Sequence, residues 1–202
     1  MLHSRTYAVR SYRKDEHLVL LRGTVQDQKP AGLYIEGDEE PLTIHHMQVD
    51  LVVRYPELRI EEASVTFGTH PHTTCPGIAS TYQALVGLSI ARGFINKVRE
   101  LFGGPRGCTH VSALLQAMAP VAIQTTWSMQ PPGGGALSGG GEHDEAEIRA
   151  AMRHNLNTCH VWDEGGAQVA SLLAGEQMEQ PLWATERLVA LGRDPQEWRS
   201  KR

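Results

Sequence analysis

The stretch Ile44–Arg54 alternates apolar and polar side chains, and this constrains the fold more than any other feature of the 202-residue chain. Met47, Val49, Leu51 and Val53 fall on one face of the stretch. A period of two is the spacing of side chains on one face of a β-strand. The stretch therefore predicts a strand with a buried face, and His45 has the parity that points into the core.

Two further strands are predicted around this one. Tyr55-Pro56-Glu57 predicts a turn, after which Leu58–Phe67 has β character. The apolar run His17–Val25 predicts an earlier strand, which Asp27-Gln28-Lys29-Pro30 would end. An antiparallel hairpin or meander with one buried face follows.

Helical patterns follow Gly68. An apolar stripe from Cys75 to Val86 predicts a helix with Pro76 at its first position, where proline is well tolerated. A second helix is expected over Ser89–Phe102 and a third from Thr109, with Pro120 kinking it. The predicted fold class is α+β, an antiparallel sheet packed against helices.

The chain is expected to have a core and an appendage. Residues 1–130 would form the α+β core, and residues 131–141 a flexible Gly/Pro-rich linker. Residues 142–202 would form a helical tail, with weak helical patterns at Glu145–His154 and Trp183–Leu191, which packs back on the core.

Composition excludes several classes of protein. The formal net charge of −4 argues against a nucleic-acid binder. No apolar run approaches the roughly 20 residues of a membrane span, and the start of the chain lacks the apolar segment of a secretory signal. The three cysteines, an odd number, indicate free thiols in a reducing cytoplasm. We expect a cytoplasmic protein with a small-molecule substrate and leave a homo-oligomer open.

Histidines and cysteines suggest a metal site. Cys75 and Cys108 each come just before or at the start of a predicted helix, where the helix dipole favours a thiolate. Thiolate and imidazole suit zinc, iron or an iron–sulfur cluster. We predict that His45, Cys75, Cys108 and His110 converge on one mononuclear zinc or iron site, with His110 as fourth ligand or general base.

Other residues near these motifs are weaker candidates. Asp27 and Lys29 are predicted to be a catalytic pair, although such a pair is often only a solvated turn. His70 and His72 lie in the loop before Cys75 and are either metal ligands or solvated side chains. Cys159 and His160 would either cover the site or be structural.

The strand, acidic turn, strand, cysteine and helix of residues 44–124 resemble the iron–sulfur scaffold proteins (the NifU N-terminal and SufE-like fold). That family has a further cysteine at the start of a late helix, which Cys108 would match. Where its first cysteine precedes the strands, this chain has His45-His46. A mixed His/Cys set favours a mononuclear metal over a transferable cluster. The sulfur-acceptor role of that fold would fall to Cys108.

Residues 10–130 are also similar to an uncharacterised bacterial family with a Gly-Cys-Thr-His-Leu motif, here Gly107–Val111. The likeness extends to Asp27 and Lys29, to His45-His46-Met47 and to Pro71–Cys75. It implies a fold and a site but no reaction.

The leading functional expectation is a metal-dependent lyase or hydrolase of small aromatic or acyl metabolites. Three protein ligands would leave a position for water or substrate on the metal. The alternatives are an iron–sulfur or sulfur-transfer protein without catalysis of its own, a purely structural metal site, and a cofactorless enzyme whose cysteines are core residues.

Overall fold

The structure is a computed structural model that describes residues 1–129, 144–176 and 178–200. The chain divides into two compact units, Met1–Met129 and Gln130–Arg202. The expected linker at residues 131–141 lies outside the described residues.

Unit 1 contains a four-stranded antiparallel sheet in the order β1-β2-β3-β4. Its strands are β1 (Ser4–Arg13), β2 (Leu18–Lys29), β3 (Leu42–Arg54) and β4 (Arg59–Thr69). The predicted meander is confirmed. The sequence did not predict β1. The expected end of β2 was also wrong, because the strand does not stop before Asp27 but continues to Lys29. The polar run that suggested a turn is paired backbone, because residues up to Lys29 pair with β3.

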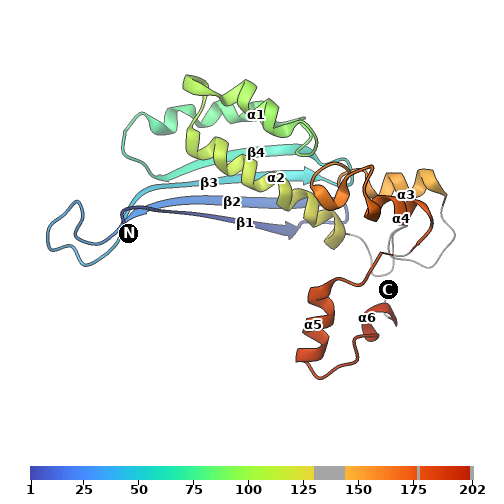
Figure 1. Ribbon diagram of the computed structural model, residues 1–202. Coiled ribbons are helices and arrows are strands. Elements are labelled where there is room, and N and C mark those ends of the chain that lie inside the picture. Colours follow the sequence, from blue (N-terminus) through green and yellow to red (C-terminus); the bar gives the residue numbers. More distant parts are fainter. Residues whose placement is uncertain (130–143, 177, 201–202) are drawn as a thin grey trace. The chain divides into compact units, whose positions relative to one another are not determined.

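Helices cover one face of this sheet (Figure 1). They are η1 (Cys75–Leu85), α1 (Phe94–Phe102), η2 (Gly104–Arg106) and α2 (Thr109–Met129). The first expected helix is a 3-10 helix, with proline in its first turn as predicted. The second begins at Phe94 rather than Ser89, because Gly93 has a left-handed φ of 82° and Ser89 bridges to Arg59 of the sheet. The α+β class, an antiparallel sheet packed against helices, is confirmed.

The long helix α2 lies directly on the middle of the sheet (Figure 1). A Cβ added at Gly23 of β2 would come within 2.7 Å of Met118 Sδ and 3.1 Å of a Leu114 methyl carbon, so only glycine lets the helix approach this closely. Strand side chains such as Val49 and Leu51 pack with the buried stripe of α2 in a single core. This contact determines which strand residues lie beneath the first turn of α2.

Unit 2 is helical over its described residues, with α3 (Glu145–Met152), α4 (Ala167–Leu173), α5 (Leu182–Ala190), α6 (Glu197–Ser200) and a short η3 (His160–Trp162). Asp144 caps α3 through a reciprocal bond pair with Glu147, a capping box. A search of the described residues found no helix with the length and apolarity needed to span a membrane.

Candidate functional site

The site begins with one row of residues across three strands. Arg5 of β1 is directly opposite Asp27 of β2, and Asp27 is directly opposite His45 of β3. Side chains of directly opposed residues project from the same face of a sheet. Asp27 has the parity of Val25 and Leu21, whose side chains face the helices, so the sheet itself places this carboxylate in the interior.

Asp27 is the ionised centre of the site. Its side chain is 1% exposed, and Arg5 holds it with two hydrogen bonds, Nε to Oδ1 at 2.6 Å and Nη2 to Oδ2 at 2.7 Å. This bidentate guanidinium lowers the pKa of Asp27 from 3.8 to about 2, in spite of burial, which acts in the other direction. His3 Nε2 lies 3.7 Å from Oδ1 and adds a weaker contact.

The packing of α2 brings His110 over Asp27. His110, Leu114 and Met118 are spaced four residues apart and share one stripe of the helix. From Met118 to His110 the helix covers about 12 Å, and from Gly23 to Asp27 the strand covers about 13 Å. Because Met118 contacts the position of Gly23, the two distances place His110 above Asp27. The observed distance from His110 Nε2 to Asp27 Oδ2 is 3.1 Å.

Two imidazoles meet on the same carboxylate oxygen. His45 Nδ1 lies 3.1 Å from Asp27 Oδ2, and its ring lies against that of His110 with a centroid separation of 4.0 Å. Burial, His45 and Arg5 lower the pKa of His110 below its usual 6.5, and the Asp27 carboxylate opposes this only in part. His110 is therefore neutral at pH 7, and its Nε2 carries the proton, because an ionised carboxylate only accepts.

The other nitrogen of His110 faces a thiol. Cys108 Sγ lies 3.6 Å from His110 Nδ1. The carbonyl of Cys108 accepts from Ser112 N at 2.9 Å, which makes Cys108 the N-cap residue of α2. The N–H of Cys108 donates to the hydroxyl of Tyr82 at 2.7 Å, and Tyr82 is buried against Phe102. The Cys108 sulfur, the His110 imidazole and the Asp27 carboxylate thus form a chain of contacts, and the hydrogen bond to Tyr82 fixes the backbone of Cys108.

The structure brings together some of the predicted site residues and not others. Among the described residues, potential ligand atoms of Asp27, His45 and His110 lie within 4.8 Å of one another. Cys108 contacts this group only through the far nitrogen of His110, and Cys75 is not part of it. Cys75 is half-buried at the start of η1.

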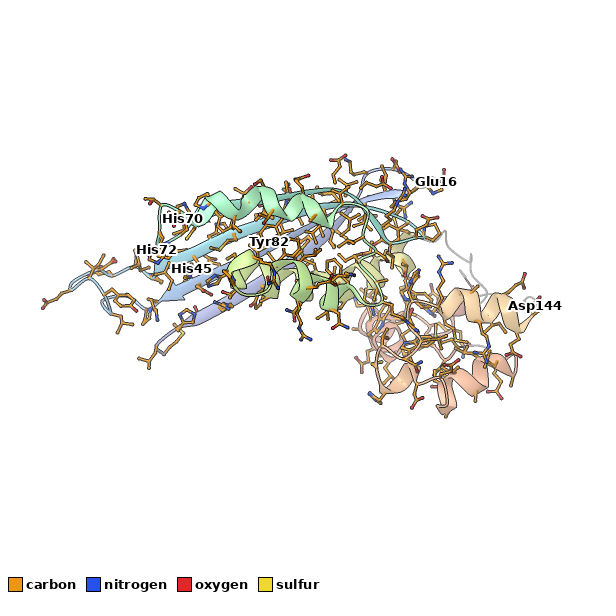
Figure 2. The ribbon with its side chains drawn as sticks, turned by 90° about the horizontal axis from the view of Figure 1, so that it is seen from above. Glu16, His45, His70, His72, Tyr82 and Asp144 are labelled. Atoms are coloured by element: carbon orange, nitrogen blue, oxygen red, sulfur yellow. The ribbon has the colours of Figure 1, made fainter. Side chains whose placement is uncertain are left out.

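The remaining predicted residues lie apart from this group. The partner of Asp27 is Arg5, whereas the ammonium of Lys29 lies 5.5 Å from the ring centroid of Tyr34. Nδ1 of His70 donates to the backbone carbonyl of His72 at 2.9 Å. Figure 2 shows both at the end of the sheet that carries His45, opposite the end with Glu16. Cys159 and His160 are exposed residues of unit 2.

Sequence reasoning missed Arg5 and His3 because it missed β1. Arg5, Tyr7 and Val9 alternate along the chain, but this pattern was too weak to predict a strand. In the middle of β1 only Ala8 and Val9 are partly buried, so the strand has no apolar face. The informative signal was Asp27, a charged residue two positions after Val25 on the apolar parity of its strand. A buried carboxylate needs a cationic partner.

Fold and site together define an α+β protein with a buried carboxylate that carries two imidazoles, one of which contacts a thiol. A family model described as "Protein of unknown function (DUF2889)" matches residues 3–124, more than half of the chain. The chain belongs to this family, and the match includes every residue of the site. Neither a curated protein nor a solved structure matches it.

Proposed function

We propose that unit 1 is a hydrolase or acyl-transfer enzyme in which Cys108 is the nucleophile, His110 its general base and Asp27 the group that orients the base. One observation carries the proposal. The ring of His110 lies between a thiol, 3.6 Å from its Nδ1, and an ionised carboxylate, 3.1 Å from its Nε2. A nucleophile within reach of a base that a third group orients is the signature of covalent catalysis.

The protonation state of the site suits this role. The Asp27 carboxylate 3.1 Å from Nε2 favours the tautomer with its proton on Nε2, so that the lone pair of the neutral ring is on Nδ1 and faces Cys108 Sγ. The thiol proton passes to Nδ1 as the sulfur attacks, and the imidazolium that forms is stabilised by Asp27. The lowered pKa of His110 keeps the ring available as a base at neutral pH.

An ester or thioester of a small carboxylic acid is the substrate class that this chemistry fits. Attack of Sγ on the acyl carbon expels the alcohol or thiol, which takes the proton from His110. The acyl group remains on Cys108 as a thioester. Water, deprotonated by His110, then releases the acid and restores the thiol. The first N–H groups of α2 have no acceptor within the helix and lie beside Cys108, where a carbonyl oxygen would become negative.

Thiol reactivity tests the proposal inside a single chain. With chelator present, iodoacetamide labelling followed by peptide mass spectrometry compares Cys108 with Cys159, which is more exposed. We expect Cys108 to react faster, and His110→Gln to slow it by roughly 10²-fold, the low end of general-base effects. Labelling of Cys159 is the internal control. Equal rates at both thiols, unchanged by His110→Gln, would contradict the assignment.

Acylation tests the reaction. A panel of p-nitrophenyl esters and acyl thioesters should give a burst of leaving group and an added acyl mass on Cys108. The Cys108→Ser variant should lose the added mass, and Cys75→Ser should keep it. A protein that never acquires an acyl mass would rule out covalent acyl transfer.

Sulfur transfer is a second candidate function, favoured by the half-buried position of Cys108 beside a base. This thiol would then take the outer sulfur of a donor persulfide, which leaves as a thiol, and carry it as a persulfide, in line with the resemblance to sulfur-acceptor scaffolds. The same mass spectra distinguish the candidates, because a persulfide adds one sulfur atom to Cys108 and no acyl group.

A further inference from the structure

The geometry points to a second use of the same group of side chains: Asp27 Oδ2, His45 Nδ1 and His110 Nε2 form a site for a divalent transition metal such as zinc or iron. The three donors come from β2, β3 and α2 and lie within 4.8 Å of one another. Two imidazoles and one carboxylate are an established ligand set for these metals. This inference does not depend on the thiol chemistry proposed above.

The distances fit a small cation with little movement. Each imidazole nitrogen lies 3.1 Å from the shared oxygen. In a tetrahedral site with bonds of about 2.0–2.2 Å, neighbouring ligand atoms are roughly 3.3–3.6 Å apart. Each nitrogen therefore needs to move away from the shared oxygen by only a few tenths of an ångström, and three protein donors leave a further position for water.

Binding requires a proton to move on each ring, and this links the metal to Cys108. Without metal, both nitrogens face the Asp27 carboxylate, which can only accept a hydrogen bond and therefore favours a proton on each of them. With metal, their lone pairs face the cation, so the protons shift to Nε2 of His45 and Nδ1 of His110. The proton on Nδ1 of His110 then points at Cys108 Sγ, and the ring can no longer accept the thiol proton. Metal binding thus removes the general base.

Cys108 is excluded from the ligand set by the same geometry. Its sulfur lies at Nδ1 of His110, whereas the metal would bind at Nε2, on the other side of the ring. Cys108 would instead hold the ring in place by accepting the Nδ1–H, as the outer partners of metal-bound histidines do.

Arg5 opposes the metal. Its Nη2 lies 2.7 Å from Oδ2, the oxygen that the metal would bind, and its Nε lies 2.6 Å from Oδ1. The guanidinium can keep Oδ1 and give up Oδ2, but its charge stays close to the cation. Replacing it with a neutral side chain should therefore raise the metal affinity, by roughly tenfold or more.

Direct titration of the full chain with zinc, in competition with a chromophoric chelator, tests the site. We expect one equivalent to bind, with loss in His45→Gln and in His110→Gln and tighter binding in Arg5→Gln. Cys108→Ser should still bind one equivalent, because the serine hydroxyl can also accept the Nδ1–H of His110. His72→Gln, at an exposed histidine, is the matched control and should bind like wild type. Cobalt-substituted protein should show no sulfur-to-metal charge-transfer band.

Two results would overturn the inference: no stoichiometric zinc binding, or binding that persists in both histidine variants while their circular dichroism is unchanged. A sulfur-to-cobalt band that Cys108→Ser abolishes would overturn the ligand set in favour of one that contains the thiol. The outcome is separable from the acyl-transfer proposal, because Cys108→Ser removes the nucleophile and leaves this site, whereas thiol labelling is measured with chelator present.

Discussion

Replacing Asp27 with asparagine should destabilise unit 1 by an amount that depends on pH. Asp27 has a pKa of about 2 in the folded protein, against 3.8 for an unperturbed side chain. One whole unit of pKa corresponds to about 1.4 kcal/mol, so ionisation of Asp27 stabilises the fold by about 2.5 kcal/mol near neutral pH. This stability is present above about pH 5 and is lost as the pH falls toward 2, because the unfolded chain takes up the proton first. The asparagine side chain of the variant does not titrate and has no such dependence.

Hydrogen exchange of the buried β3 amides measures this effect, since these amides report the opening of unit 1. At pH 5 the free energy of opening should be about 2–3 kcal/mol lower in the Asp27→Asn variant than in wild type. This is the low end for a broken buried ion pair, because the Arg5 side chain is 35% exposed to water. By pH 3 the difference in opening free energy between wild type and variant should be smaller by about 1 kcal/mol. A difference that stays constant between these pH values would refute the idea that Asp27 is ionised and paired with Arg5.

Three further predictions follow from contacts around the site. Gly23→Ala should lower the free energy of unfolding, measured in urea, by about 1–3 kcal/mol, because its Cβ would lie 2.7 Å from Met118 Sδ. The double variant with Met118→Ala should lose less stability than the sum of the two single variants. Tyr82→Phe should cost about 1 kcal/mol and slow the labelling of Cys108, whose N–H loses its acceptor at 2.7 Å; unchanged labelling would show that this bond does not position the thiol. Because the pKa of His110 lies below its usual value, the labelling rate of Cys108 should fall less between pH 7 and pH 6 than the roughly tenfold slowing of an unassisted thiol. A tenfold fall at Cys108 over that interval would argue against the base.

The sheet and helices were largely predictable because their patterns are local. Alternation in Ile44–Arg54 and the stripe that begins at Thr109 each report a buried face, and both elements occur as expected. The exceptions have physical causes. β1 is an edge strand that is exposed over most of its length, so no apolar pattern reveals it. The polar end of β2 resembled a turn in the sequence. It is a strand because its backbone pairs with β3, and backbone pairing, unlike burial, does not require apolar side chains.

The sequence predicted several residues of the site, but not which of them contact one another. His45 was expected to face the core on parity, and it lies on the same row as Asp27. Cys108 and His110 were recognised because they begin α2. What sequence could not supply was the direction in which each ring nitrogen points, and that direction places Cys108 on the far side of His110 from Asp27. Cys75, also at a helix start, had the same local signal and lies apart from the group.

Of the two proposed uses of this site, Arg5 favours the thiol and its base over the metal. The charges of Asp27 and Arg5 cancel, so this pair offers a cation no surplus negative charge. The same pairing keeps Asp27 ionised and therefore keeps the proton of His110 on Nε2, which leaves Nδ1 free to take the proton of Cys108. With Arg5 in place the balance lies with the thiol and its base. Loss of the guanidinium contact at Oδ2 favours the metal, so a substrate whose own anionic group draws Arg5 away from Asp27 would move the site from one state toward the other.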